Sequence, residues 1–224
     1  TDAGLEKDFK KLNSRAVQIA VEAREKTNAE HVCVAGGISY WTWTGRKPSL
    51  AELKRTVTTQ AQIMAESGAD LLMLEMMIDV EQMMVTYEAA KSSGLPIWVG
   101  LTCEPNDRGE ICLRDGDPLE QALFLLANDK PDVINIMHTD VSHVIEALNY
   151  LKSVWHDPVG VYAHSGKTDN GKWTFNDVLS PAEYHEYAKS WVDKGVKFIG
   201  GCCGINVKHI NLLNETLIKN SRQE

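Results

Sequence analysis

Hydrophobic residues follow two alternating patterns along the chain. In residues 5–28 they recur at roughly helical spacing, which predicts an amphipathic helix. Residues 70–75, DLLMLE, are instead a short continuous apolar run, as expected of a strand that is buried on both faces. The same two patterns predict further helices at 49–67, 79–93, 118–129, 141–154, 180–195 and 206–219, and further strands at 31–39, 97–104, 132–139, 159–166 and 197–204.

Short strands that alternate with helices predict an α/β fold with a parallel sheet. An open doubly wound sheet and a closed barrel both fit this order. Polar or reactive residues stand at the end of nearly every predicted strand. This favours a barrel, in which several consecutive strands contribute to one site, over a doubly wound sheet, whose site lies at one crevice. No phosphate-binding loop of the GxGxxG or GxxxxGK[ST] type occurs, which weakens a nucleotide-binding interpretation. The residues at the strand ends are Glu75, Thr102, Glu104, His138, His164, Cys202 and Cys203.

The number of strands bears on the barrel interpretation. A (β/α)8 barrel of the TIM type needs eight strands, whereas the pattern predicts six here. The chain also opens directly into a helix. We therefore expect residues 1–224 to form a single (β/α) barrel domain whose first two strands are missing from this chain.

Composition and charge narrow the classes of function. The chain is 43% hydrophobic and 24% charged, as is typical of soluble globular proteins. A net charge of -8 argues against nucleic acid as a partner, because phosphate binding needs clustered Lys and Arg. No apolar run is long enough to span a membrane, and the N-terminal residues do not resemble a signal peptide. An odd number of cysteines, five, favours a reducing, cytoplasmic location over a disulfide scaffold.

The strongest local signal is the motif GGCCG at residues 200–204. Two adjacent thiols at the end of a buried strand suit a soft metal such as zinc, which binds thiolates in near-tetrahedral geometry. The flanking glycines let the backbone bend, so that Cys202 and Cys203 can face one ion. Two small buried cysteines that only fill space in the core would give the same motif. The residues by themselves leave a metal or redox site and simple packing both open.

The surroundings of this motif resemble a known family. FIGGCCGINVKHI (198–210) is similar to the signature of the homocysteine S-methyltransferases, in which GGCCG is followed by a helix. The resemblance implies a barrel enzyme that uses zinc to activate the thiol of homocysteine. Further segments resemble the family in the same order, namely LNSRAVQIAVEAR (12–24), VAGGIS (34–39), SGADLLMLEMM (67–77), LPIWVGLTCE (95–104) and VYAHSG (161–166).

The chain departs from the family pattern at the third zinc ligand. Family members have an Asn-Cys pair at the end of their sixth strand, whereas Asn135 is followed here by Ile136. Strand side chains repeat every two residues, so His138 would share the face of Ile136 and could supply the third ligand. His138 could instead cap the strand or bind substrate in a site without zinc. The ligands that we predict are Cys202, Cys203 and His138, with His164 as a second candidate.

The resemblance also implies how the substrates bind. Glu75, at the end of its strand, would bind the amine of homocysteine. The methyl donor must be cationic, and aromatic rings stabilise such cations; the aromatic loop at 39–45 could bind it or could simply cover the barrel mouth or a partner surface. The predicted substrate-binding residues are Glu75, Tyr40, Trp41, Trp43, His164 and Asn135, and the predicted catalytic residues are Cys202, Cys203 and Glu75.

Two hypotheses for the function result from these observations. The first is a zinc-dependent methyltransferase that makes methionine from homocysteine and a sulfonium or quaternary ammonium donor. Its partners would then be small molecules, and a homo-oligomer is possible. The second is a zinc-free or degenerate barrel that binds a small sulfur or ammonium compound without this chemistry. The zinc content of the purified protein distinguishes the two hypotheses. A thiol oxidoreductase is a weaker alternative, because the chain has no C-x-x-C motif.

Overall fold

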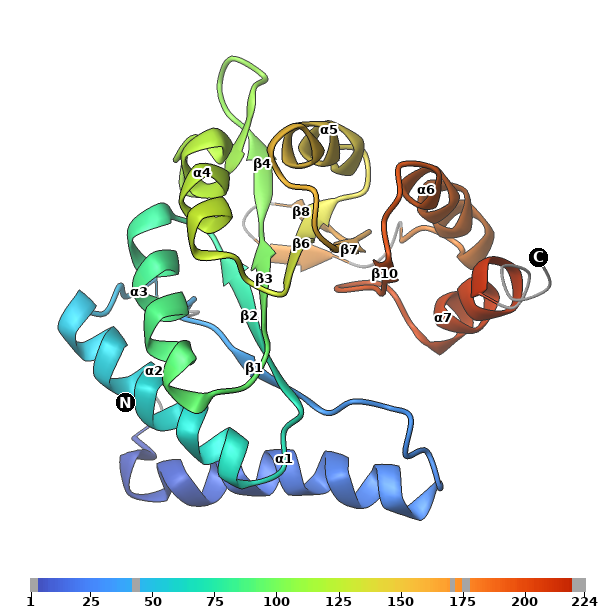
Figure 1. Ribbon diagram of the computed structural model, residues 1–224. Coiled ribbons are helices and arrows are strands. Elements are labelled where there is room, and N and C mark those ends of the chain that lie inside the picture. Colours follow the sequence, from blue (N-terminus) through green and yellow to red (C-terminus); the bar gives the residue numbers. More distant parts are fainter. Residues whose placement is uncertain (1–3, 42–44, 170–171, 175–177, 219–224) are drawn as a thin grey trace. The chain divides into compact units, whose positions relative to one another are not determined.

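The computed structural model describes residues 4–41, 45–169, 172–174 and 178–218. The chain divides into two compact units, Thr1–Val99 and Gly100–Glu224 (Figure 1). Strand β3 (Ile97–Leu101) begins in the first unit and ends in the second. None of the helices in the described ranges is long and apolar enough to cross a membrane.

The described part of the first unit consists of parallel strands and of helices that pack on one another. Strands β1 and β2 run parallel, with Ile38 opposite Leu74, and helix α2 contacts both α1 and α3 (Figure 1). The N–H of Leu72 donates to the C=O of Pro96, next to the start of β3. The elements before β3 are a 3-10 turn (Glu6–Asp8), α1 (Phe9–Lys26), β1 (Ala35–Ile38), α2 (Leu50–Glu66), β2 (Leu71–Met77), α3 (Val80–Ala90) and a second 3-10 turn (Lys91–Ser93).

Local sequence signals set the helix boundaries in this unit. The hydroxyl of Ser49 accepts a hydrogen bond from the N–H of Glu52 at the start of α2, and the carboxylate of Asp79 accepts one from the N–H of Gln82 at the start of α3. Both contacts satisfy N–H groups that a helix leaves unpaired in its first turn. The 3-10 turn that follows α3 ends at Gly94, whose positive φ of 72° suits glycine.

In the second unit, strand β7 pairs in parallel with β6 on one side and with the short strand β10 on the other. Strand β6 is buried over all but its last residue, and helices α6 and α7 pack against each other (Figure 1). The elements after β3 are β4 (Cys103–Pro105), β5 (Ile111–Leu113), α4 (Leu119–Asp129), β6 (Val133–Asp140), α5 (Val144–Val154), β7 (Val159–His164), β8 (Lys167–Asp169), β9 (Lys172–Thr174), α6 (Pro181–Asp193), β10 (Phe198–Ile199), α7 (Val207–Leu213) and a π-helical turn (Asn214–Ile218).

Three of the predicted strands differ strongly from the observed ones. The run at 31–39 forms a strand only over Ala35–Ile38. The run at 97–104 is divided between β3 and β4, and β4 turns back to pair with β5 in an antiparallel hairpin. The run at 197–204 forms a strand only over Phe198–Ile199. Its apolar residues end there, and the glycines and cysteines that follow form an irregular loop with a turn.

Strand β6 carries a bulge near its carboxyl end. Met137 lies opposite Tyr162 and Asp140 lies opposite His164, so β6 has one residue more than β7 over this stretch. Within it, His138 has a φ of 44°, a left-handed conformation that is uncommon for residues other than glycine. Bulges of this kind redirect side chains and are frequent beside functional sites.

Candidate metal centre

Three side chains of the second unit meet at the carboxyl ends of β6 and β10. The Nδ1 atom of His138 lies 3.3 Å from the Sγ atom of Cys202 and 3.7 Å from the Sγ atom of Cys203. The two sulfur atoms are 3.8 Å apart. The described residues thus bring together the three ligands that the sequence predicted, which we name the His138 cluster.

The spacing of the His138 cluster fits a zinc ion. Zinc binds sulfur at about 2.3 Å and imidazole nitrogen at about 2.0 Å, so tetrahedral angles put neighbouring ligand atoms about 3.5–3.8 Å apart. The three observed distances of 3.3, 3.7 and 3.8 Å lie close to that range. One imidazole and two thiols are also ligands that zinc prefers. The donor set therefore suits zinc in both chemistry and geometry.

The backbone of the cysteine loop is hydrogen-bonded along the end of β7. The N–H of Cys202 donates to the C=O of Ala163 at 2.9 Å, and the C=O of Cys203 accepts from the N–H of Ser165 at 3.0 Å. Gly204 then turns the chain with a φ of 84°, and a Cβ there would lie 2.8 Å from the hydroxyl oxygen of Ser165. The glycine that follows the cysteines is therefore required by both the turn and the close approach.

Tyr184 of α6 contacts the residues that lead into the same loop. Its side chain is fully buried, and its hydroxyl donates to the C=O of Gly200 at 2.9 Å. The ring packs edge-on against Trp191 and His209, with centroid distances of 5.5 and 5.9 Å. Burial raises the pKa of Tyr184, so the hydroxyl remains a donor. Helix α6 thereby holds the strand end from which Cys202 and Cys203 project.

Burial gives His138 the protonation state that a metal ligand needs. The ring is 7% exposed, and burial lowers its pKa to about 4, with smaller contributions from His164 and Arg114. Its neutral form is therefore dominant at neutral pH. Only the neutral ring has the nitrogen lone pair that can bind a metal.

Two further predicted residues belong to the same unit as the cluster. The ring of His164, at the end of β7, lies 4.8 Å from that of His138 between centroids, but His164 is not one of the three residues whose ligand atoms come within 4.8 Å of one another. Asn135 on β6 is 1% exposed and lies opposite Gly160. Its Oδ1 atom occupies the space that a Cβ at Gly160 would need.

The remaining predicted residues belong to the first unit. Glu75 lies within β2, two residues before the strand ends at Met77, and not at the strand end that the sequence predicted. Its Oε2 atom would be 3.0 Å from a Cβ on Gly37. Tyr40 is 5% exposed, and its hydroxyl accepts from the N–H groups of Ile78 and Asp79. That hydroxyl therefore anchors the chain after β2, which is a structural role. Trp41 is partly exposed, and Trp43 lies outside the described residues.

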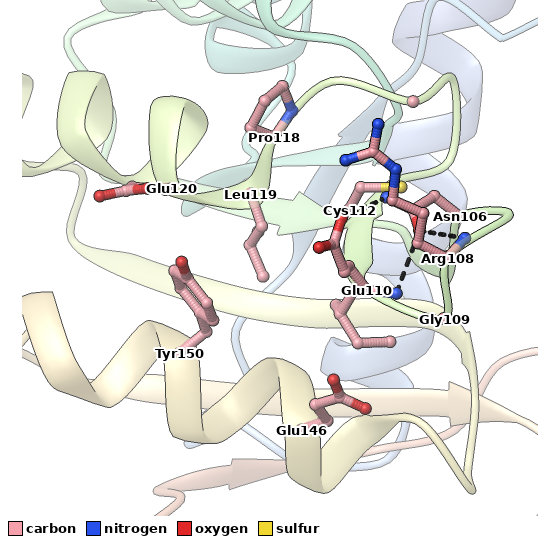
Figure 2. Close-up of a pocket in the computed structure, with 12 residues that line it drawn as sticks. Asn106, Arg108, Gly109, Glu110, Cys112, Pro118, Leu119, Glu120, Glu146 and Tyr150 are labelled. Atoms are coloured by element: carbon pink, nitrogen blue, oxygen red, sulfur yellow. Dashed lines mark hydrogen bonds between the residues drawn. The ribbon is translucent and has the colours of Figure 1, made fainter.

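A surface cavity of about 480 Å³ in the second unit is separate from the His138 cluster. It lies between the β4–β5 hairpin, the start of α4 and one face of α5, and Figure 2 shows Glu146 and Tyr150 of α5 on one side of it. The exposed side chains of Arg108, Glu110 and Glu120 also line it. No residue of the cluster contributes to this cavity, so it does not define the candidate site.

Comparison with known proteins identifies the family. The family model described as homocysteine S-methyltransferase matches residues 1–217. The chain belongs to the homocysteine S-methyltransferase family. It is 23% identical over 217 residues to homocysteine S-methyltransferase 2 of Arabidopsis thaliana, which covers 94% of the chain and 63% of that relative. It is 27% identical over 225 residues to betaine–homocysteine S-methyltransferase 1 of Bos taurus, covering 92% and 53%.

A solved structure of the family has the same fold. The homocysteine methyltransferase MmuM from Escherichia coli, in its apo form, matches with a TM-score of 0.74 at 22% identity, covering 92% of the chain and 72% of MmuM. The metallated form of MmuM matches with the same TM-score at 21% identity, covering 92% and 70%. This likeness confirms the predicted α/β fold of the TIM-barrel type. The chain spans less than two thirds of the length of both relatives named above.

Within this member of the family, the sequence did not reveal two structural residues near the cluster. One is Tyr184, and the other is Thr139, whose hydroxyl oxygen accepts from the N–H of Cys103 and donates to the C=O of Met137 across the bulge. The signal for Tyr184 was present, because a tyrosine on the apolar face of a helix must find a partner for its hydroxyl. Nothing in the sequence marks the bulge that Thr139 holds.

Replacing Glu75 by glutamine should stabilise the fold at alkaline pH. Burial raises the pKa of Glu75 above its ordinary value of 4.5, so the folded chain binds a proton more tightly than the unfolded chain. Stability contributed by this proton is present at low pH and is lost as pH rises through the raised pKa. Glu75→Gln should therefore have a higher Tm than the wild type at pH 8, and the difference should vanish below about pH 4.5.

Thermal unfolding across this pH range measures the effect. Glu81→Gln, which removes the same charge from an exposed position on α3, is the matched control and should show no such trend. A Glu75→Gln variant that is less stable than the wild type at pH 8 would contradict the burial argument.

Proposed function

We propose that the protein transfers a methyl group from a sulfonium or quaternary ammonium donor to the thiol of homocysteine, which gives methionine. Cys202, Cys203 and His138 hold the zinc ion that this reaction uses. The observation that carries the proposal is the His138 cluster: three zinc-type donor atoms at near-tetrahedral spacing, in a chain of this family. The names of the two relatives and the metallated form of MmuM support both the acceptor and the metal.

Bound zinc supplies a Lewis acid that lowers the pKa of a thiol, so that a thiolate nucleophile exists at neutral pH. The chain provides the three ligands that would hold the zinc ion. His138 contributes a neutral nitrogen, while Cys202 and Cys203 contribute the thiolates. Three protein ligands are typical of catalytic zinc sites, which leave one position for the substrate. The hydrogen bonds from Tyr184 and along β7 keep the two cysteines in place.

Two residues of the first unit keep the substrate roles that the family resemblance implies. Glu75 binds the α-amine of homocysteine through its carboxylate, and Trp41 offers an aromatic face to the cationic donor. Asn135 of the second unit keeps its predicted role in substrate binding. The five cysteines form no disulfide with one another, and Cys202 and Cys203 must remain reduced to bind zinc, which supports a cytoplasmic location. A homo-oligomer stays a prediction.

The test combines metal analysis with an activity assay. Purified protein should contain about one zinc per chain, and it should convert homocysteine to methionine with a sulfonium donor, a betaine donor or both. Removing zinc with a chelator should abolish the product, and adding zinc should restore it. Zinc-loaded protein that makes no methionine with either class of donor would overturn the proposal.

A second candidate function rests on the replaced family cysteine. Ile136 follows Asn135 where the family has its third zinc cysteine, so a zinc-free protein that binds a small sulfur or ammonium compound is the alternative. Such a protein would be isolated without zinc and would still bind a sulfonium ligand in calorimetry. The zinc content decides between the two functions.

A further inference from the structure

His138 occupies a backbone conformation that needs support. Its φ of 44° lies in the left-handed region, and it falls within the β6 bulge. Such a conformation costs of the order of 1 kcal/mol or more and persists only where surrounding contacts hold it. On the side of β4, Thr139 provides one such contact by accepting from the N–H of Cys103 at 2.9 Å.

The contacts of His164 lie on the other side of the bulge. His164 ends β7 opposite Asp140, and its ring is 8% exposed and tilted by 54° against the ring of His138, with 4.8 Å between centroids. Burial lowers the pKa of His164, whereas Asp140 and a hydrogen bond to the backbone of His138 act in the opposite direction. A contact that favours the protonated ring is one to an acceptor, so the partner is the C=O of His138.

His164 therefore touches both parts of His138 that set the direction of the Nδ1 atom. The hydrogen bond reaches the backbone of the residue with positive φ, and the ring contact lies against its imidazole. Outer partners that orient a metal ligand usually affect metal affinity by about 10–100-fold. We propose that His164 is a positioning residue that orients His138 toward the zinc ion, and that it is neither a zinc ligand nor a catalytic residue. This inference rests on the proposed zinc site.

The test measures the zinc dissociation constant by competition with a chromophoric chelator. His164→Ala should bind zinc about 10–100-fold more weakly than the wild type. His164→Asn should recover most of the affinity, because an amide N–H can donate to the same C=O of His138. His156→Ala removes an exposed histidine of the same unit and should bind zinc like the wild type.

Cobalt substitution separates positioning from a general loss of structure. In His164→Ala loaded with Co²⁺, the visible d–d bands should change because the nitrogen ligand is displaced, while the sulfur-to-cobalt charge-transfer band should remain because both thiolates stay bound. A purely structural role would instead lower the Tm of the metal-free protein and leave the cobalt spectrum of the folded fraction unchanged.

The outcomes distinguish this inference from the proposed function. Wild-type protein that does not bind zinc would overturn the proposed function and this inference with it. Wild-type protein that binds zinc, together with a His164→Ala variant of equal affinity and an unchanged cobalt spectrum, would overturn the positioning role alone. Loss of the sulfur-to-cobalt band in His164→Ala would also contradict it, because the effect would then extend to the cysteine loop.

Discussion

Replacing either Cys202 or Cys203 by serine should leave a folded protein that neither retains zinc nor transfers a methyl group. Each thiolate is one of three protein ligands, and a serine hydroxyl is a poor ligand for zinc because it stays protonated at neutral pH. The loss of affinity should exceed the about 100-fold effect of removing an outer partner. Metal analysis of the purified variants and the methionine assay measure the two losses.

Two controls make this result specific. Cys33→Ser removes an exposed free thiol of the first unit, and Cys112→Ser removes a buried one from the β4–β5 hairpin of the second unit. Both variants should keep zinc and activity. Circular dichroism should give the same helical signal for all four variants. A Cys202→Ser variant with a full complement of zinc would refute the metal site itself.

The order of helices and strands was predictable because apolar residues recur at helical spacing in the helices and form short continuous runs in the buried strands. Strand β2, for example, falls within two residues of the DLLMLE run, and helix α2 begins where Ser49 can cap it. Elements whose length depends on tertiary contacts were less predictable. Strand β10 stops after Ile199, since the residues that follow it serve a loop rather than a sheet.

The three residues of the His138 cluster were predictable for unequal reasons. Cys202 and Cys203 are adjacent in one specific motif, so the sequence alone indicates that their thiols lie close together. His138 was reached by assuming the two-residue period of a regular strand, but β6 is bulged at this point, and His138 approaches the sulfurs through a backbone with positive φ. The prediction thus named a residue that does lie beside the two cysteines, but it did so through an incomplete geometric argument.

Aromatic residues were the hardest to interpret from the sequence. Tyr40 was expected to bind the methyl donor, yet its hydroxyl is hydrogen-bonded to the backbone at Ile78 and Asp79 and its ring is buried. A buried aromatic residue and a ligand-binding one look alike in a sequence, because both need apolar surface with one polar group. Only the partner of the hydroxyl distinguishes them, and that partner lies 38 positions away along the chain.

Replacing His138 by asparagine should remove the third zinc ligand without disturbing the bulge. Asparagine tolerates the left-handed conformation better than most residues, so it can adopt the φ of 44° found here. Its amide lacks the basic nitrogen of imidazole and should bind zinc poorly. We expect the zinc affinity of His138→Asn to fall by more than about 100-fold, which exceeds the loss expected for an outer partner, and the methionine assay to fall in parallel.

A second substitution turns this loss into a test of the ligand role. His138→Cys supplies a thiolate in place of the imidazole, so it should bind zinc more tightly than His138→Asn even though cysteine suits the left-handed backbone less well. His138→Ala shares that backbone cost but offers no donor, so the difference between the cysteine and alanine variants isolates the ligand bond from the strain. If all three variants bound zinc as tightly as the wild type, His138 would not be a ligand. The two cysteines would then need another third partner, and the near-tetrahedral spacing of the cluster would reflect packing alone.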